Sequence, residues 1–142
     1  MSISVVYWSG TGNTEAMAEI LAEGIREADG KVSVIEVGSA DAQELMKEDT
    51  FALGCPSMGA EELEESEMEP FVARLEGKMS GKKVLLFGSY GWGDGEWMRR
   101  WETRMKNAGA VLVTGSGIIA NGVPDDETEA VLKAAGRELA SA

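Results

Sequence analysis

The spacing of apolar and polar positions changes repeatedly along the chain. Short apolar or alternating runs are typical of strands, and apolar residues that recur every three or four positions are typical of helices. The expected strands are 3–7, 31–37, 50–55, 84–87 and a last, interrupted strand made of 111–113 and 118–119. The expected helices begin near Glu15, at Asp41, in the seventies, near Trp97 and at Asp125.

Five strands that alternate with five helices predict an α/β fold with a doubly wound parallel sheet and helices on both faces. Right-handed crossovers favour the strand order 2-1-3-4-5 as the simplest arrangement. Neither a repeat nor a linker divides the 142 residues, so we expect one domain over residues 1–142.

Helical spacing also predicts the side chains that face the core. The fourth helix is expected to bury Trp97, Trp101 and Met105. The last helix is expected to turn Val131, Leu132, Ala135 and Leu139 inward. Cys55 is the only cysteine, which excludes an intramolecular disulfide and a Cys-ligated iron–sulfur cluster. We expect it to be a small core residue.

The loop after the first strand, Trp8–Thr14, has the composition of an anion site. Gly10 and Gly12 allow the backbone to curl around a ligand, and the helix that follows begins with unpaired N–H groups. The loop holds neither Lys nor Arg, and its spacing differs from the nucleoside triphosphate and dinucleotide motifs. We therefore expect a site for one terminal phosphate. Its side-chain donors are Ser9, Thr11, Asn13 and Thr14.

Two further loops follow the third and fourth strands, and a doubly wound sheet brings all three loops to one edge, where ligands bind. One carries Met58, and the other carries Trp92 with Tyr90 between glycines. A thioether and an indole both make favourable contacts with an aromatic face. A flat aromatic ligand with a phosphate tail is therefore expected between Met58 and Trp92.

The composition limits the classes of partner and of chemistry that the chain can support. The chain has 13 Lys and Arg against 25 Asp and Glu, a net charge of −12 and a pI near 4.4. This balance opposes nucleic acid or an anionic membrane as partner and favours a basic protein surface. The absence of His excludes Ser-His-Asp hydrolysis and histidine metal sites. Without a signal-peptide pattern or an apolar run of about 20 residues, we expect a cytoplasmic monomer.

Three motifs together resemble flavodoxin, in particular the short-chain flavodoxins of anaerobic bacteria. They are Trp-Ser-Gly-Thr-Gly-Asn-Thr (8–14), Met-Gly-Ala-Glu-Glu (58–62) and Gly-Ser-Tyr-Gly-Trp-Gly-Asp-Gly (88–95). The resemblance spans essentially the whole chain and implies FMN as a tightly held, non-covalent cofactor. Its 5′-phosphate would lie on residues 9–14. The other implied contacts are Pro56, Ser57, Met58, Gly59, Ala60, Glu61, Ser89, Tyr90, Gly91, Trp92, Gly93 and Asn121.

The resemblance also implies individual roles. Met58 and Trp92 would flank the isoalloxazine ring, the Gly59 backbone would face N5, and Glu61 would approach N3. Ala60 departs from the family pattern, because relatives often carry Asp or another small polar residue there. A four-residue turn from Met58 to Glu61 has two candidate forms, and the type II′ form wants glycine at position 59. The type II form would force Ala60 to positive φ, so we expect the flipped form.

The implied function is a low-potential one-electron carrier rather than an enzyme, with FMN cycling mainly between the neutral semiquinone and the anionic hydroquinone. Its partners would be redox proteins with basic docking surfaces, namely oxidoreductases that otherwise use ferredoxin. Six glutamates between Glu61 and Glu69 would border the flavin edge and form the docking surface.

Two other classes of protein are alternatives to the carrier. An FMN-dependent NAD(P)H reductase shares the fold, although the chain has no spare segment for a nicotinamide pocket. A phospho-receiver domain needs an acidic pair after the first strand and an Asp at the end of the third. The chain has Trp8-Ser9 and Cys55-Pro56 at those places.

Overall fold

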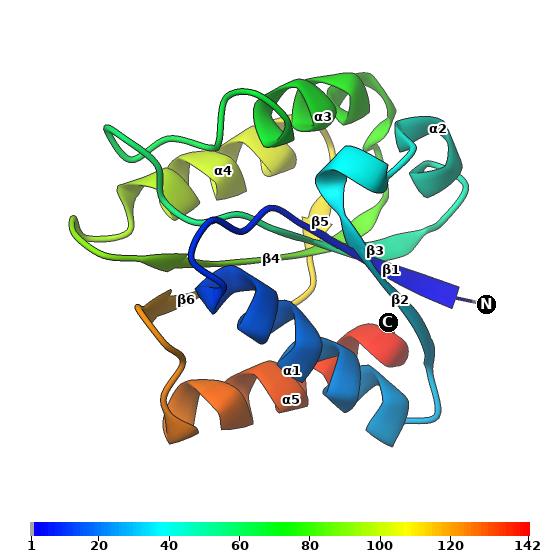
Figure 1. Cartoon of the computed structure of the whole chain (residues 1–142). Helices are drawn as coiled ribbons and strands as arrows, with labels where there is room; N and C mark the ends of the chain where they lie inside the picture. Colours follow the sequence, from blue (N-terminus) through cyan, green and yellow to red (C-terminus); the bar gives the residue numbers. More distant parts are fainter. Residues whose placement is uncertain (1) are drawn as a thin grey trace.

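A twisted parallel sheet lies between two layers of helices in the computed structural model, which describes residues 2–142 (Figure 1). The strands are β1 (Ser2–Tyr7), β2 (Lys31–Glu36), β3 (Thr50–Gly54), β4 (Lys83–Tyr90), β5 (Val111–Leu112) and β6 (Ile118–Asn121). The helices are α1 (Asn13–Glu27), α2 (Ala42–Leu45), α3 (Met68–Leu75), α4 (Glu96–Asn107) and α5 (Asp126–Ala140), with 3-10 turns at Val37–Ser39 and Glu76–Lys78.

The strand order is β2-β1-β3-β4-β5 with every pair parallel, which confirms the predicted sheet. Helices α1 and α5 cover one face, and α2, α3 and α4 cover the other (Figure 1). The interrupted last strand is present as two strands that pair with the same neighbour. β5 pairs with residues 83–84 of β4, and β6 pairs with residues 87–90. Among residues 2–142, no helix is both long and apolar enough to cross a bilayer.

Several boundaries differ from the expected ones. Helix α1 begins at Asn13, two residues earlier than expected, so Asn13 and Thr14 belong to its first turn. Strand β4 runs on to Tyr90 because Ser89 and Tyr90 pair with Ala120 and Asn121 of β6. Apolar periodicity alone ends this strand at residue 87, since the extension depends on pairing with a distant strand.

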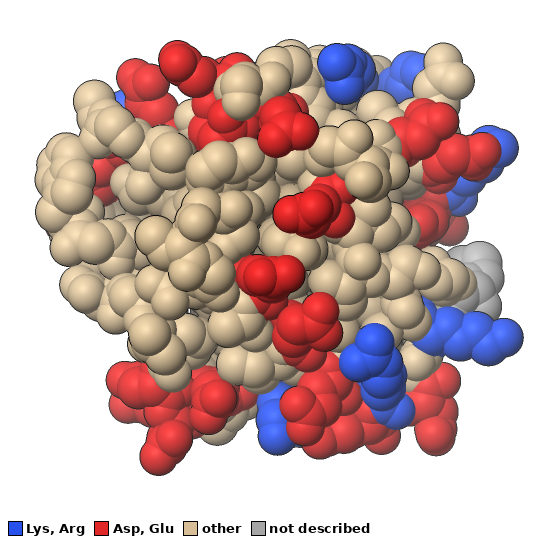
Figure 2. Space-filling model, in the orientation of Figure 1, with Lys and Arg blue, Asp and Glu red and all other residues tan. Residues whose placement is uncertain are grey.

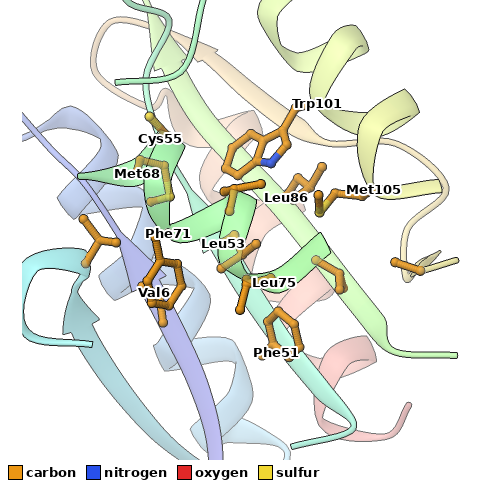
Figure 3. Packing of buried hydrophobic residues seen from close by; sticks show 14 of the residues in the cluster. Val6, Phe51, Leu53, Cys55, Met68, Phe71, Leu75, Leu86, Trp101 and Met105 are labelled. Atoms are coloured by element: carbon orange, nitrogen blue, oxygen red, sulfur yellow. The ribbon is translucent and has the colours of Figure 1, made fainter. Parts of the chain in front are cut away.

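The buried side chains form one cluster on each face of the sheet. Trp97, Trp101 and Met105 are at most 1% exposed, as predicted. Trp101 and Met105 of α4 and Phe71 of α3 belong to one of these clusters, and in Figure 3 Leu53 lies between Trp101 and Phe71. Cys55 is also fully buried, as predicted.

Helix α5 buries Leu132, Ala135 and Leu139, but Val131 is 47% exposed. The prediction that Val131 points inward is therefore wrong. Successive residues of a helix are rotated by about 100°, and the buried face is centred on residues 132, 135 and 139. Position 131 falls beyond the edge of that face.

Candidate cofactor site at the carboxyl ends of the strands

The loops after β1, β3, β4 and β6 all emerge at one end of the sheet, because these strands are parallel (Figure 1). They comprise residues 8–12, 55–67, 91–95 and 122–125. Two backbone hydrogen bonds tie them together. The Ser57 N–H donates to the Ser89 carbonyl at 2.9 Å, and the Gly122 N–H donates to the Tyr90 carbonyl at 3.0 Å.

In the first loop, two backbone N–H groups converge on one oxygen atom. Gly12 and Glu15 donate to Ser9 Oγ at 3.1 and 3.3 Å. Gly12 adopts a left-handed conformation with φ of 95°, and helix α1 has no side-chain cap. A phosphate oxygen is a stronger acceptor than a hydroxyl for such donors. The loop thus fits the phosphate that the sequence predicts, and Gly10, Thr11 and Gly12 are exposed for it.

Thr14, the last residue of the phosphate motif, is only 1% exposed. Its Oγ1 lies 3.0 Å from Ser89 Oγ and accepts a 3.3 Å hydrogen bond from the Ser89 N–H. Thr14 therefore links the start of α1 to the carboxyl end of β4. This link was not predicted, because it joins residues that are 75 positions apart.

The second loop closes one residue later than expected. Met58 and Glu62 exchange two backbone hydrogen bonds, of 2.9 and 2.8 Å, around residues 59–61. The left-handed residues are Gly59, with φ of 50°, and Glu61, with φ of 57°, whereas Ala60 is not left-handed. The expected four-residue turn ending at Glu61 is therefore wrong. Gly59 is left-handed as the type II′ form requires, but the second strained position falls on Glu61.

The carboxylate of Glu61 joins the second loop to the third. Its Oε1 accepts a 3.0 Å hydrogen bond from the N–H of Glu96, the first residue of α4. Gly93 has φ of 87°, which favours glycine, and a Cβ there would lie 2.6 Å from this carboxylate and displace it. Oε2 accepts no hydrogen bond from residues 2–142.

The third loop exposes an aromatic ring. Trp92 is 65% exposed beside Gly91 and Gly93, which are also exposed. Tyr90 is half-buried, and its ring packs against Trp97 with centroids 5.7 Å apart at 47°. Asn121 is exposed at the end of β6 and pairs with Tyr90. A large exposed indole between two exposed glycines suits a site that a flat ligand covers.

Comparison with known proteins agrees with this geometry. The family model described as flavodoxin matches residues 5–134. The chain belongs to the flavodoxin family.

Individual flavodoxins resemble the chain along nearly its whole length. It is 51% identical over 129 residues to a flavodoxin of Clostridium beijerinckii, covering 91% of this chain and 94% of the relative. It is 46% identical over 127 residues to a flavodoxin of Megasphaera elsdenii, covering 89% and 91%. The solution structure of two-electron reduced Megasphaera elsdenii flavodoxin superposes with a TM-score of 0.90 at 44% identity, covering both chains completely.

Family membership confirms two of the expectations. FMN is the cofactor of flavodoxins, and flavodoxins are electron-transfer proteins rather than enzymes. The protein is thus an FMN-binding electron carrier that exchanges electrons with redox partner proteins. The residue-by-residue contacts with the flavin remain predictions.

Among the six glutamates of this flavodoxin's acidic segment, residues 61–69, one is buried. Glu64 is 6% exposed, and its carboxylate accepts hydrogen bonds from the N–H groups of Glu67 at 2.7 Å and Met68 at 3.1 Å. It also accepts from the N–H and the hydroxyl of Ser66. Burial alone would raise the pKa of Glu64, but these hydrogen bonds lower it. Glu64 thus caps the start of α3. This role could not be predicted from its position among six glutamates.

A second glutamate of the segment is paired. Arg104 of α4 bonds to both Glu69 and Glu76. The exposed glutamates of the segment are Glu62, Glu65 and Glu67. Fewer exposed carboxylates are therefore available for the expected docking surface than the sequence suggests.

Proposed function

We propose that FMN in this protein cycles mainly between the neutral semiquinone and the anionic hydroquinone at low potential. The observation that supports this most is the phosphate loop, in which neutral donors meet at Ser9 without any Lys or Arg. A phosphate dianion held there keeps its charge, and the chain itself carries −12. A further negative charge on the ring is opposed by both.

The surroundings of the ring act in the same direction. The loop end of the molecule is largely uncharged in Figure 2, with acidic side chains on both sides of it. Stacking on Trp92 places an electron-rich face against the reduced ring, which disfavours added negative charge. Each tenfold weakening of hydroquinone binding relative to semiquinone binding lowers the potential of this one-electron couple by about 59 mV.

The loop closed by Met58 and Glu62 is proposed to stabilise the semiquinone. Reduction adds a proton at flavin N5, and this proton needs an acceptor. The Gly59 carbonyl supplies one when the peptide after Gly59 is flipped, and Gly59 has φ of 50°, a conformation that favours glycine. A side chain at this φ costs about 1 kcal/mol. We expect Gly59→Ala to lower the maximum semiquinone yield, with Gly77→Ala as control; an unchanged yield would remove this role.

The remaining contacts are proposed from the family pattern. Met58 and Trp92 flank the ring, and the free Oε2 of Glu61 accepts from N3 while Oε1 stays on α4. The 5′-phosphate lies on residues 9–14. The ring edge and ribityl chain contact Pro56, Ser57, Ala60, Ser89, Tyr90, Gly91, Gly93 and Asn121.

Partner proteins are proposed to approach the flavin edge with a basic surface, namely oxidoreductases that otherwise use ferredoxin. Glu62 and Glu65 are exposed next to the second loop and have no ion-pair partner among residues 2–142. Exposed charges of this kind raise association rates more than affinity, and salt screens them. Electron-transfer rates should therefore fall as ionic strength rises. We expect the carrier itself to be a monomer.

Stepwise dithionite reduction under anaerobic conditions tests the carrier, with visible spectra and reference dyes recorded at each step. We expect a blue neutral semiquinone and a second potential well below that of free FMN. A second potential at or above that of free FMN would overturn the low-potential proposal. NAD(P)H oxidation by the pure protein is the discriminating assay for the reductase alternative, and we expect none.

A further inference from the structure

Three exposed valines lie on elements near the β5–β6 edge of the sheet. The large hydrophobic residues with exposed side chains are Trp92, Val111, Val123 and Val131. Trp92 belongs to the cofactor loops. The other three lie on β5, on the loop after β6 and on α5, the elements at the β5–β6 edge of the sheet. Single exposed valines need no explanation, but Val131 also lines a groove at this edge.

A groove of about 520 Å³ runs between β6 and α5 in this region. Its apolar residues include Ile118, Val131 and Ala134, and its acidic residues are Asp125, Glu127 and Glu138. No Lys or Arg lines it. The groove therefore favours a segment with apolar side chains and positive charge.

The backbone of β6 is open along the groove. The Gly122 N–H points to β4, where it bonds to Tyr90, and alternate residues of a strand point to the same side. Ile119 and Asn121 consequently direct their N–H and C=O groups away from β4. Within the described chain, only β4 pairs with β6. Such an edge is a template for another strand.

We propose that this edge is a docking surface for an extended, basic segment of a partner protein, which adds a strand beside β6 with its apolar side chains in the groove. The net charge of −12 and the three groove carboxylates disfavour a second copy as occupant, because both copies would bring acidic edges together. Asn121 ends β6 at the cofactor loops, so a segment bound here brings its protein next to the flavin end. The partner's redox role rests on the proposed function, but strand addition does not.

The test uses the FMN-loaded protein and a capped heptapeptide of alternating Lys and Val. Backbone amide NMR shifts should concentrate at Ile119 and Asn121. The same peptide with N-methyl groups on its pairing edge keeps its charge and side chains, and should bind at least about tenfold more weakly because strand pairing is blocked. A Glu-Val peptide should not bind. Equal binding of the N-methylated peptide, or shifts confined to residues 61–69, would overturn the proposal.

Charge reversal on the protein supplies a second arm. Glu127→Lys with Glu138→Lys should weaken binding of the Lys-Val peptide roughly tenfold at low salt. The matched control is Glu36→Lys with Glu44→Lys, near β2 at the opposite edge, which should change binding less than about twofold. Equal losses of peptide affinity in the two double variants would show that the groove is not the binding site. Concentration-dependent dimerisation that perturbs Ile119 would make a second copy the occupant and overturn the proposed partner. Flavin binding is titrated separately. Failure of the proposed carrier function can therefore be distinguished from failure of strand addition at β6.

Discussion

The indole Nε1 of Trp97 donates a 3.0 Å hydrogen bond to the backbone carbonyl of Cys55. Cys55 is the first residue of the second cofactor loop, and Trp97 lies in the first turn of α4, directly after the third loop. The ring of Trp97 also packs against Tyr90. One buried side chain thus supports both of the loops that are expected to hold the flavin ring.

Trp97→Phe should loosen the second loop. The change leaves a buried carbonyl unpaired, at a cost of about 1–3 kcal/mol. Riboflavin and FMN affinities should fall by a similar factor, since the phosphate loop is not touched. Amide hydrogen exchange at Ser57 and Met58 should accelerate.

Trp101→Phe is the matched control for this experiment. Trp101 is equally buried on the same helix, but its Nε1 has no hydrogen-bond partner in the described chain. Both variants lose the same volume, and only Trp97→Phe loses a hydrogen bond. Equal effects on flavin affinity and amide exchange would show that Trp97 acts through packing alone.

The Cys55 thiol should be inert in the native protein. Burial raises the pKa of the Cys55 thiol to about 12, and its side chain is fully buried. Reaction with an aromatic disulfide reagent at pH 8 should be at least roughly a thousandfold slower than in the unfolded chain, because the thiolate is scarce and inaccessible. Thiol release in native buffer and in denaturant measures this ratio. Fast, stoichiometric labelling of the native protein would contradict it.

The order and type of the elements were predictable because strand and helix periods differ clearly in this chain. The phosphate loop was also predictable, since a local motif between a strand and a helix determines its conformation. The ends of the strands and helices were less predictable. Ser89 and Tyr90 join β4 only because β6, about 30 residues later, pairs with them.

Contacts between loops could not be predicted from the sequence either, because they also depend on how distant segments pack together. Glu61 bonds to the start of α4, and Glu64 folds back on the start of α3, although both stand in one acidic run. The charge pattern alone makes these side chains equivalent. Tertiary folding separates them into a link between loops, a buried cap and the solvated neighbours Glu62 and Glu65.

Glu64→Gln should destabilise the protein by about 1–3 kcal/mol at pH 7, because a carboxylate that accepts several hydrogen bonds is lost at a helix start. The folded-state pKa of Glu64 lies below its ordinary value. Its contribution is therefore present above the unfolded-state pKa near 4.3 and is lost as the pH falls through the lower folded-state value.

Urea unfolding at pH 7 and near pH 3 measures this loss. The difference between wild type and Glu64→Gln should shrink at the lower pH. Glu65→Gln, on an exposed neighbour, should stay within about 0.5 kcal/mol at both. A difference in unfolding free energy that does not change with pH would show that Glu64 acts through its shape and not through its charge.

Gly24 and Gly136 allow α1 and α5 to touch. A Cβ at Gly24 would lie 2.3 Å from the Lys133 carbonyl oxygen, and one at Gly136 would lie 2.4 Å from the Leu21 carbonyl oxygen. Gly24→Ala must therefore push the helices apart and should cost about 1–3 kcal/mol or more. Gly77→Ala meets nothing within 4 Å and should be neutral or slightly stabilising. Denaturant unfolding of both variants measures the contrast, and equal stability would contradict the packing argument.

Thr14 and Thr11 should separate two roles within one phosphate motif. Thr11 is exposed, so Thr11→Val should weaken FMN binding while leaving riboflavin affinity and the melting temperature of the apoprotein nearly unchanged. Thr14 is buried against Ser89, so Thr14→Val should lower the stability of the apoprotein by about 1 kcal/mol. In a double-mutant cycle with Ser89→Ala, a coupling energy of about 1 kcal/mol is expected, because the two hydroxyls share one hydrogen bond. Additive losses would mean that the hydrogen bond between Thr14 and Ser89 does not hold α1 against β4.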